Sequence, residues 1–326
     1  MNILELPFDQ YQRYKILQEA IDLLREDDKS LKILEVGGYP GNILGFLPED
    51  NITIVDQKES KLPSYRQADA LDLPFGEGEF DVSVSLDVLE HIPPDKRERF
   101  IRELWRTCRD HLLLAAPFDL PLRVQAEQIV IQFISHKLGY THPPLEEHRR
   151  YGLSRREEII GILKNLGAEI LVLPNGNLSR WVMMMILLFY LESEAELGPV
   201  AELVNHYYNY NYYKYDNCEP CYRELLIASK KELPKAKVEA LEALVSPGQE
   251  KAEPDFSPAQ LLLELINLEL LKKKDRIIEH KDQLLKEKEN EIRNLYDHIR
   301  VLEEFMAKVK ATLPYKIYQT FFKKKG

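Results

Sequence analysis

A glycine-rich segment near the N-terminus has the residue types that let a backbone pass close to a bound ligand. It begins at Leu34, reads LEVGGYPGN and directly follows a short apolar run. Gly37, Gly38 and Gly41 have no Cβ, so the backbone there can turn sharply and approach a ligand without steric clashes. We expect this loop to join a buried strand to a helix, which is where open parallel sheets bind their ligands.

Two acidic residues further along the chain could bind the polar groups of a nucleoside. Asp56 ends the apolar segment NITIVD, where a carboxylate can accept hydrogen bonds from both ribose hydroxyls. Asp69 lies in QADALDLPF, after a third and weaker strand, where it can meet an adenine amino group. The glycine loop followed by these acids predicts a nucleoside-binding site rather than a set of ordinary turn residues.

Alternating strand and helix patterns can position these residues. Apolar runs predict strands, and apolar residues at helical spacing predict helices between them. This alternation predicts an α/β fold with a Rossmann-like, doubly wound sheet that is mostly parallel. The last two predicted strands favour a final antiparallel hairpin. The predicted strands are LKILEVGG, NITIVD, residues 65–68, FDVSVSL, HLLLAAP, AEILVLP and YRELLIAS; the predicted helices are residues 10–26, DKRERFIRELWRTC, RREEIIGILKNLG and residues 181–192.

These blocks together resemble the class I S-adenosylmethionine-dependent methyltransferases that act on small molecules and glycans. The matching residues are Glu35-x-Gly37-x-x-x-Gly41, Asp56, Asp69 to Phe75, Phe80-Asp81-Val82 and Leu89-Glu90-His91-Ile92. The resemblance is close over residues 30–120 and looser over 121–231. It implies that S-adenosylmethionine is the cofactor. It also implies that Glu35 and the loop hold the methionine end, that Asp56 binds the ribose and that Asp69 binds the adenine. Gly38, Ala70 and Leu86 complete the implied cofactor-binding set.

One position of the loop departs from the family pattern. Tyr39-Pro40 replaces the family's middle glycine, which makes the loop stiffer and bulkier. A dinucleotide is the rival ligand, but the spacing of Gly37, Gly38 and Gly41 does not fit G-x-G-x-x-G, whose second glycine admits a pyrophosphate. S-adenosylmethionine has no pyrophosphate, so an acid such as Glu35 is compatible with it.

Three histidines are candidates for a general base. Methyl transfer from a sulfonium needs mainly alignment of the acceptor, although an oxygen acceptor would benefit from a base. His91 follows the fourth predicted strand, while His142 and His148 flank HPPLEEH after the fifth strand. Asp87 and Glu147 are acids that could support them. Each histidine could instead serve a structural role, His91 by capping a turn and the others as surface loop residues.

Composition excludes several classes of protein. The 326 residues carry a net charge of −10, so we expect no nucleic-acid partner. Three cysteines cannot form a disulfide framework, and the N-terminus lacks the pattern of a signal peptide, which favours the cytoplasm. Cys218-x-x-Cys221 has zinc-like spacing, but no second pair exists in the chain, so we expect no metal site.

The C-terminal part has a different pattern. We divide the chain into a methyltransferase domain (1–232), a proline-rich linker (233–258), a coiled coil (259–312) and a basic aromatic tail (313–326). Apolar residues spaced three and four apart from Leu285 to Val309 form a heptad seam, interrupted by Lys288. A single amphipathic helix packed on the domain is the simpler interpretation. Six lysines and no acid occur from Lys308 onward, so the tail could bind an anionic membrane surface.

Together these patterns predict an enzyme that methylates a small-molecule or glycan acceptor in a polysaccharide or cell-envelope pathway. The coiled coil would make it a homo-oligomer, and the tail could hold it at the inner face of the membrane. The alternative is a non-catalytic scaffold that keeps the fold and binds partners through the coiled coil, which Tyr39-Pro40 favours. A nucleotide-binding oxidoreductase is a third function, and the absent second glycine disfavours it.

Overall fold

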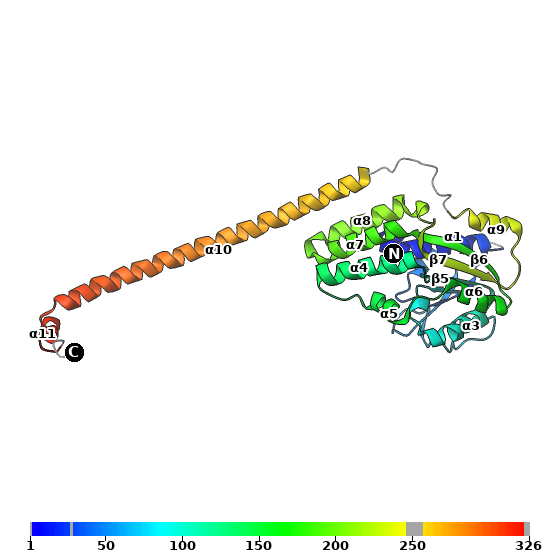
Figure 1. The fold of residues 1–326 in the computed structure, drawn as a ribbon, viewed down its shortest axis with the longest axis horizontal. Coiled ribbons are helices and arrows are strands. Elements are labelled where there is room, and N and C mark those ends of the chain that lie inside the picture. The colour runs from blue at the N-terminus through cyan, green and yellow to red at the C-terminus, as the bar shows by residue number, and fades with distance from the viewer. Residues whose placement is uncertain (1, 27–28, 246–256, 323–326) are drawn as a thin grey trace. The chain divides into compact units, whose positions relative to one another are not determined.

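The computed structural model describes residues 2–26, 29–245 and 257–322. The chain divides into two compact units, residues 1–258 and 259–326. The first unit is built on one seven-stranded sheet, coloured from blue to yellow in Figure 1.

The sheet has the order β3-β2-β1-β4-β5-β7-β6. β7 is antiparallel to both of its neighbours, and the other pairs are parallel. The predicted Rossmann-like sheet with a final antiparallel hairpin is therefore confirmed. In chain order the strands are β1 (Lys32–Val36), β2 (Asn51–Asp56), β3 (Tyr65–Gln67), β4 (Phe80–Leu86), β5 (Cys108–Ala116), β6 (Glu169–Asn177) and β7 (Cys221–Ser229).

Helices cover both faces of the sheet because successive strand residues point to opposite sides. On β5, Leu113 and Ala115 join the core beneath α1 (Phe8–Leu24), α2 (Ile43–Phe46) and α9 (Lys235–Glu242). Leu112 and Leu114 join the opposite core, beneath α3 (Arg97–Thr107) and α6 (Arg156–Asn165).

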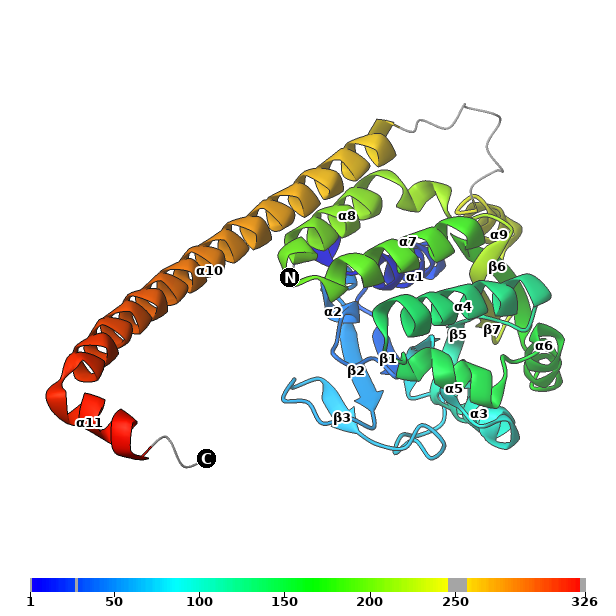
Figure 2. The same ribbon diagram turned by 60° about the vertical axis from the view of Figure 1, so that its left-hand side comes forward.

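A further group of helices is inserted after β5 and after β6. α4 (Pro121–Phe133) lies beside α7 (Leu178–Ser193), which lies beside α8 (Gly198–Asn211), as Figure 2 shows. α5 (Pro143–Tyr151) contacts the short turn η2 (Leu89–His91) that follows β4. This contact brings the end of β4 and the inserted segment together. The remaining short turns are η1 (Ile3–Glu5), η3 (Pro94–Lys96), η4 (Ile134–Leu138), η5 (Ala195–Leu197) and η6 (Tyr213–Tyr215).

The segment predicted as a linker contains helix α9. Leu241 on α9 is fully buried in the core with α1, and Lys237 Nζ donates to the carbonyl of Leu24 at 2.6 Å. Full burial of a leucine side chain contributes about 1.5–3 kcal/mol to the free energy of unfolding. The first unit therefore uses residues beyond position 232 for its stability.

The second unit consists of the long helix α10 (Ser257–Ala311) and the short helix α11 (Leu313–Phe322). In the part of α10 whose side chains are described, most large apolar residues are 44–68% exposed, while Val309 is partly buried. Within the described ranges, no helix is both long enough and apolar enough to cross a membrane.

Candidate active site

The glycine loop follows β1 at the carboxyl edge of the sheet, as predicted. Gly37 has φ +85°, and a Cβ on it would lie 2.2 Å from Val88 Cγ2. A Cβ on Gly38 would lie 2.1 Å from Glu35 Oε2. Real Cβ atoms essentially never make contacts this short, so a side chain at either position would force Val88 or Glu35 to shift. The close approach also places Val88, just beyond β4, against the loop.

The carboxylate of Glu35 is buried beneath this loop with one oxygen unpaired. Oε1 accepts a hydrogen bond from the Tyr14 hydroxyl at 2.8 Å, while Oε2 has no partner among the described residues. Burial raises the pKa of Glu35 to about 7. A buried acceptor without a donor is costly, and the ammonium of a methionine moiety would supply both a donor and the opposite charge. Glu35 therefore fits the role that the resemblance implies.

Asp56 ends β2 at the rim of the loop. Its Oδ2 accepts from the Tyr39 amide at 3.3 Å and its Oδ1 from the Lys58 amide at 3.1 Å. The carboxylate is thus held in place and is only partly buried. The Tyr39 ring is 44% exposed and lies 4.9 Å from the Lys58 ammonium, so the bulky residue of the loop is directed toward the surface.

The remaining predicted cofactor residues follow β3 and end β4. β2 pairs with β3 so that Asp56 is opposite Gln67, which places Asp69 two residues further along the same edge. Asp69 is exposed, and its Oδ1 accepts from the Leu71 amide at 2.9 Å. Ala70 is half-buried and Leu86 is buried.

A buried ion-pair network lies just beyond β4. Asp87 is a non-glycine residue with φ +51°, a conformation that costs energy and often marks a functional site. Its carboxylate accepts from Arg13 Nη1 at 2.8 Å and from Arg223 Nε at 3.0 Å. Burial acts to raise the pKa of Asp87, but the charges of Arg223 and Arg13 outweigh it and hold the pKa below its usual range.

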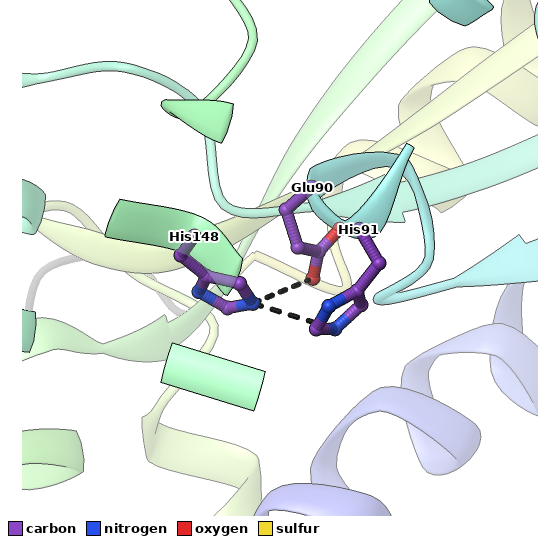
Figure 3. A group of neighbouring side chains, drawn as sticks. All are labelled: Glu90, His91 and His148. Carbon is purple, nitrogen blue, oxygen red and sulfur yellow. Dashed lines mark hydrogen bonds and ion pairs between the residues drawn. The ribbon is translucent and has the colours of Figure 1, made fainter. Parts of the chain in front are cut away.

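Two of the three candidate histidines meet beside this network. His91 in η2 and His148 in α5 have their Nε2 atoms 3.4 Å apart. His91 Nδ1 lies 2.8 Å from Glu147 Oε2, and His148 Nδ1 lies 2.8 Å from Glu127 Oε1. Glu90 Oε1 is 4.0 Å from His148 Nε2, and all three central side chains are drawn in Figure 3.

The protonation of this cluster is distributed unevenly. Burial and the charge of His148 lower the pKa of His91. Burial also acts to lower the pKa of His148, but its hydrogen bond to Glu127 and the nearby carboxylates raise that pKa overall. Burial and the charge of Asp87 raise the pKa of Glu90 to about 8. His91 is therefore the histidine of the pair that stays neutral more readily and can accept a proton.

The third candidate, His142, has a different environment. Its Nδ1 accepts from the Leu145 amide at 3.5 Å, which caps the start of α5, and its ring packs edge-on against Phe189. Among the residues that the structure describes, no hydrogen bond joins it to His91 or His148. The geometry therefore supports His91 and His148 as a pair and gives His142 a capping role.

Several residues of the site lay outside the sequence prediction. Arg13 and Tyr14 come from the first helix, and Glu127 comes from α4. Arg223 lies on β7 and is 1% exposed. The sequence could have indicated Arg223, because a charged residue within an otherwise apolar strand needs a buried partner of opposite charge. The other three face the site only because of how the helices pack.

A family model identifies one kind of domain within the chain. Residues 38–114 match the family model described as a methyltransferase domain. No curated protein matches the chain. The match begins within the glycine loop, includes Asp56, Asp69 and His91, and ends in β5.

Solved structures similar to this chain include several methyltransferases. A possible histamine N-methyltransferase from Thermotoga maritima is 14% identical, with a TM-score of 0.37, over 68% of this chain and 92% of that one. Magnesium protoporphyrin IX methyltransferase from Synechocystis is 13% identical, with a TM-score of 0.41, over 69% and 85%. A putative methyltransferase from Bacillus halodurans is 14% identical, with a TM-score of 0.38, over 65% and 99%.

Proposed function

This chain carries a class I S-adenosylmethionine-dependent methyltransferase domain, and we propose that it methylates a hydroxyl group of a small-molecule or glycan acceptor. S-adenosylmethionine is the cofactor of such a domain. Glu35 would hold its ammonium, and Asp56 would hold its ribose. Asp69 would bind the adenine at the same edge of the sheet.

The acceptor would lie on the side of the loop where β4 ends. When bound, the cofactor supplies a methyl group that its sulfonium has already activated. His91 Nε2 would accept the hydroxyl proton, and Glu147 would hold the ring by binding Nδ1. The observation that carries this proposal is the position of His91 in the turn η2, which directly follows Val88, the residue that packs against Gly37 of the glycine loop.

Mass spectrometry can test the proposed reaction. Purified protein would be incubated with S-adenosylmethionine bearing a deuterated methyl group and with a panel of monosaccharides, oligosaccharides and phosphorylated sugars. We expect one labelled methyl group on at least one hydroxylated acceptor, and slower transfer by His91→Asn. Cofactor binding without transfer to any acceptor, by protein with and without its tail, would favour the non-catalytic scaffold.

Helix α10 supports self-association. Its seam includes Leu285, Ile292, Leu295 and Leu302, each at least half exposed. A helix of 55 residues is about 80 Å long, and such a seam is stable in water only when a partner covers it. The partner in this proposal is the same helix of a second copy, because the seam follows the heptad spacing of a self-pairing coiled coil.

The tail supports a peripheral membrane contact. Ile317, Tyr318 and Phe321 on α11 are 49–74% exposed, and lysines precede and follow them in the sequence. Aromatic residues with lysines favour the headgroup region of an anionic leaflet. An enzyme held there by several copies of its tail would meet acceptors of a cell-envelope or polysaccharide pathway, at the inner face of the membrane.

A further inference from the structure

The cluster beside the proposed acceptor position brings three possible metal-ligand atoms close together. His91 Nε2 and His148 Nε2 are 3.4 Å apart, and Glu90 Oε1 is 4.0 Å from His148 Nε2 (Figure 3). One donor atom from each of the three side chains lies within 4.8 Å of the other two. The two histidines are 57 residues apart in the chain, so the fold brings them together.

The other nitrogen of each imidazole is already bound. Glu147 holds His91 Nδ1 and Glu127 holds His148 Nδ1, each at 2.8 Å. An ionised carboxylate accepts a hydrogen bond, so each Nδ1 carries the proton and each neutral ring keeps its lone pair on Nε2. In that state two lone pairs face each other at 3.4 Å and repel, and either a proton on one ring or a metal ion between the rings removes the repulsion. Carboxylates that bind the second nitrogen of a histidine are also the usual support of metal-ligating imidazoles.

The carboxylate of Glu90 also lacks a full set of partners. It is 1% exposed, and its Oε2 has no hydrogen-bond partner in the part of the chain that the structure describes. The guanidinium of Arg97 donates to backbone carbonyls, while Arg13 and Arg223 bind Asp87. When this buried carboxyl group is ionised it needs a positive charge beside it, and a cation at the histidine pair would supply one.

We propose that His91 Nε2, His148 Nε2 and Glu90 form a binding site for a divalent transition-metal ion, with Zn²⁺ the best match. Two nitrogens bound at about 2.0–2.1 Å to a tetrahedral ion lie about 3.3–3.4 Å apart, which agrees with the distance between these two atoms. Two histidines and one carboxylate leave a fourth position for an oxygen ligand such as water or a hydroxyl.

A second cluster shows what a site already filled by a protein cation looks like. Glu219, Cys221 and Glu224 also lie close enough to share an ion. There the buried guanidinium of Arg123 donates to Cys221 Sγ at 3.0 Å and to Glu224 Oε1 at 2.7 Å. Its positive charge takes the place that a metal would occupy. Among the described residues, no guanidinium donates a hydrogen bond to the histidine cluster; Arg97 interacts with Glu90 through its charge but donates to backbone carbonyls.

The metal site stands on its own geometry, while a role for it in methyl transfer rests on the proposed function. The lone pair on His91 Nε2 cannot bind a metal ion and accept a proton at the same time. The metal-bound site and the His91 base are therefore alternative states of the enzyme, and the metal content of the protein decides which of them operates.

Metal binding can be measured without any acceptor. Untagged full-length protein would be stripped with a chelator and dialysed against Zn²⁺ or Co²⁺ alone. We expect about one ion per chain by elemental analysis, with visible absorption of the Co²⁺ form indicating nitrogen and oxygen ligands. Glu90→Gln and His148→Asn should each weaken binding at least tenfold. Glu127→Gln should weaken it about 10–100-fold, because it removes the support of a ligand.

Matched controls separate the metal from other effects. Glu219→Gln and His142→Asn change the same residue types outside the cluster and should bind the ion normally. Circular dichroism identifies variants that fail to fold, and Glu90→Gln nearly preserves side-chain shape. Substoichiometric metal in the folded wild type, or normal binding by Glu90→Gln, would overturn the site. Calorimetry of the chelated protein with S-adenosylmethionine tests the proposed function separately, since cofactor binding needs none of these three residues.

Discussion

At the scale of single residues, we expect the buried carboxylate of Glu35 to connect proton uptake to cofactor binding. Glu35 has one oxygen paired with Tyr14 and one unpaired, and its pKa is about 7 because it is buried. The folded state therefore binds more protons than the unfolded state between pH 4.5 and about 7. Through this residue, the free energy of unfolding falls as pH rises across that window. A cationic ligand on the free oxygen would reverse that loss.

We accordingly expect S-adenosylmethionine binding to release a proton near neutral pH. The ligand's ammonium stabilises the ionised form of Glu35, so affinity should rise between pH 6 and pH 8. Calorimetry in two buffers with different ionisation enthalpies measures the released proton. Glu35→Gln should bind more weakly and show no such release. Proton release by that variant equal to the wild type would mean that another group titrates.

Asp56, the proposed ribose-binding residue, gives a second prediction at this scale. Charge-assisted hydrogen bonds from ribose hydroxyls contribute about 1.5–3 kcal/mol each, so Asp56→Ala should weaken S-adenosylmethionine binding at least tenfold. The side chain is only partly buried, so the variant should remain folded. An unchanged calorimetric dissociation constant in the folded variant would refute the role of Asp56.

At the scale of elements, the loop between β1 and α2 defines the space above the carboxylate. A Cβ on Gly38 would lie within 2.1–2.7 Å of three atoms of the Glu35 side chain. Glu35 is buried and bound to Tyr14, so it cannot move aside at low cost. The absent side chain of Gly38 is thus a requirement of the loop.

Gly38→Ala should therefore reduce cofactor affinity more than tenfold, because the added methyl group displaces Glu35. Gly161→Ala is the matched control, since a Cβ there meets no atom within 4 Å and the residue lies in helix α6. That control should keep cofactor affinity and gain up to about 1 kcal/mol of stability from helix propensity. Equal affinity of the two variants would remove the proposed constraint.

Sequence patterns predicted the sheet better than they predicted the site. The strands are short apolar runs between helices, and burial on both faces gives such runs a clear pattern. The loop and its acids could be proposed from the sequence because each ends a strand or follows one closely. The pairing of His91 with His148 depends on α5 packing against η2, which no local pattern encodes. Helix α9 was missed because the prolines around it suggested a linker.

At the scale of the whole molecule, the chain combines a folded unit that has the methyltransferase fold with a long exposed helix. The first unit extends through α9, because Leu241 packs in its core. A chain ending at residue 245 keeps this helix, whereas a chain ending at residue 233 removes it. Truncation at residue 245 therefore tests the role of α10 in assembly, and comparison with truncation at residue 233 tests the contribution of α9 to stability.

We predict that the chain ending at residue 245 folds, binds cofactor and has lost most self-association. The full-length chain should form a parallel dimer or trimer through α10, and light scattering measures its mass. The chain ending at residue 233 should be less stable by about 1.5–3 kcal/mol, since it loses the buried Leu241. A monomeric full-length chain would disprove assembly through α10.

The tail gives a prediction about membranes. Full-length protein should float with anionic vesicles, and less so at high salt, because lysines contribute about 1 kcal/mol each near an anionic leaflet. A chain ending at Thr312 keeps the long helix but lacks α11, so it should remain assembled and should not float. Equal flotation of both chains would exclude the tail as the membrane contact.

The identity of the bound nucleoside is the most direct test of the account. Calorimetric titration of the purified protein with S-adenosylmethionine, and separately with a nicotinamide dinucleotide, measures it in one experiment. The account predicts one S-adenosylmethionine site per chain and no measurable dinucleotide binding, because the loop has no second glycine to admit a pyrophosphate. Preference for the dinucleotide, or no affinity of the folded protein for S-adenosylmethionine, would contradict it.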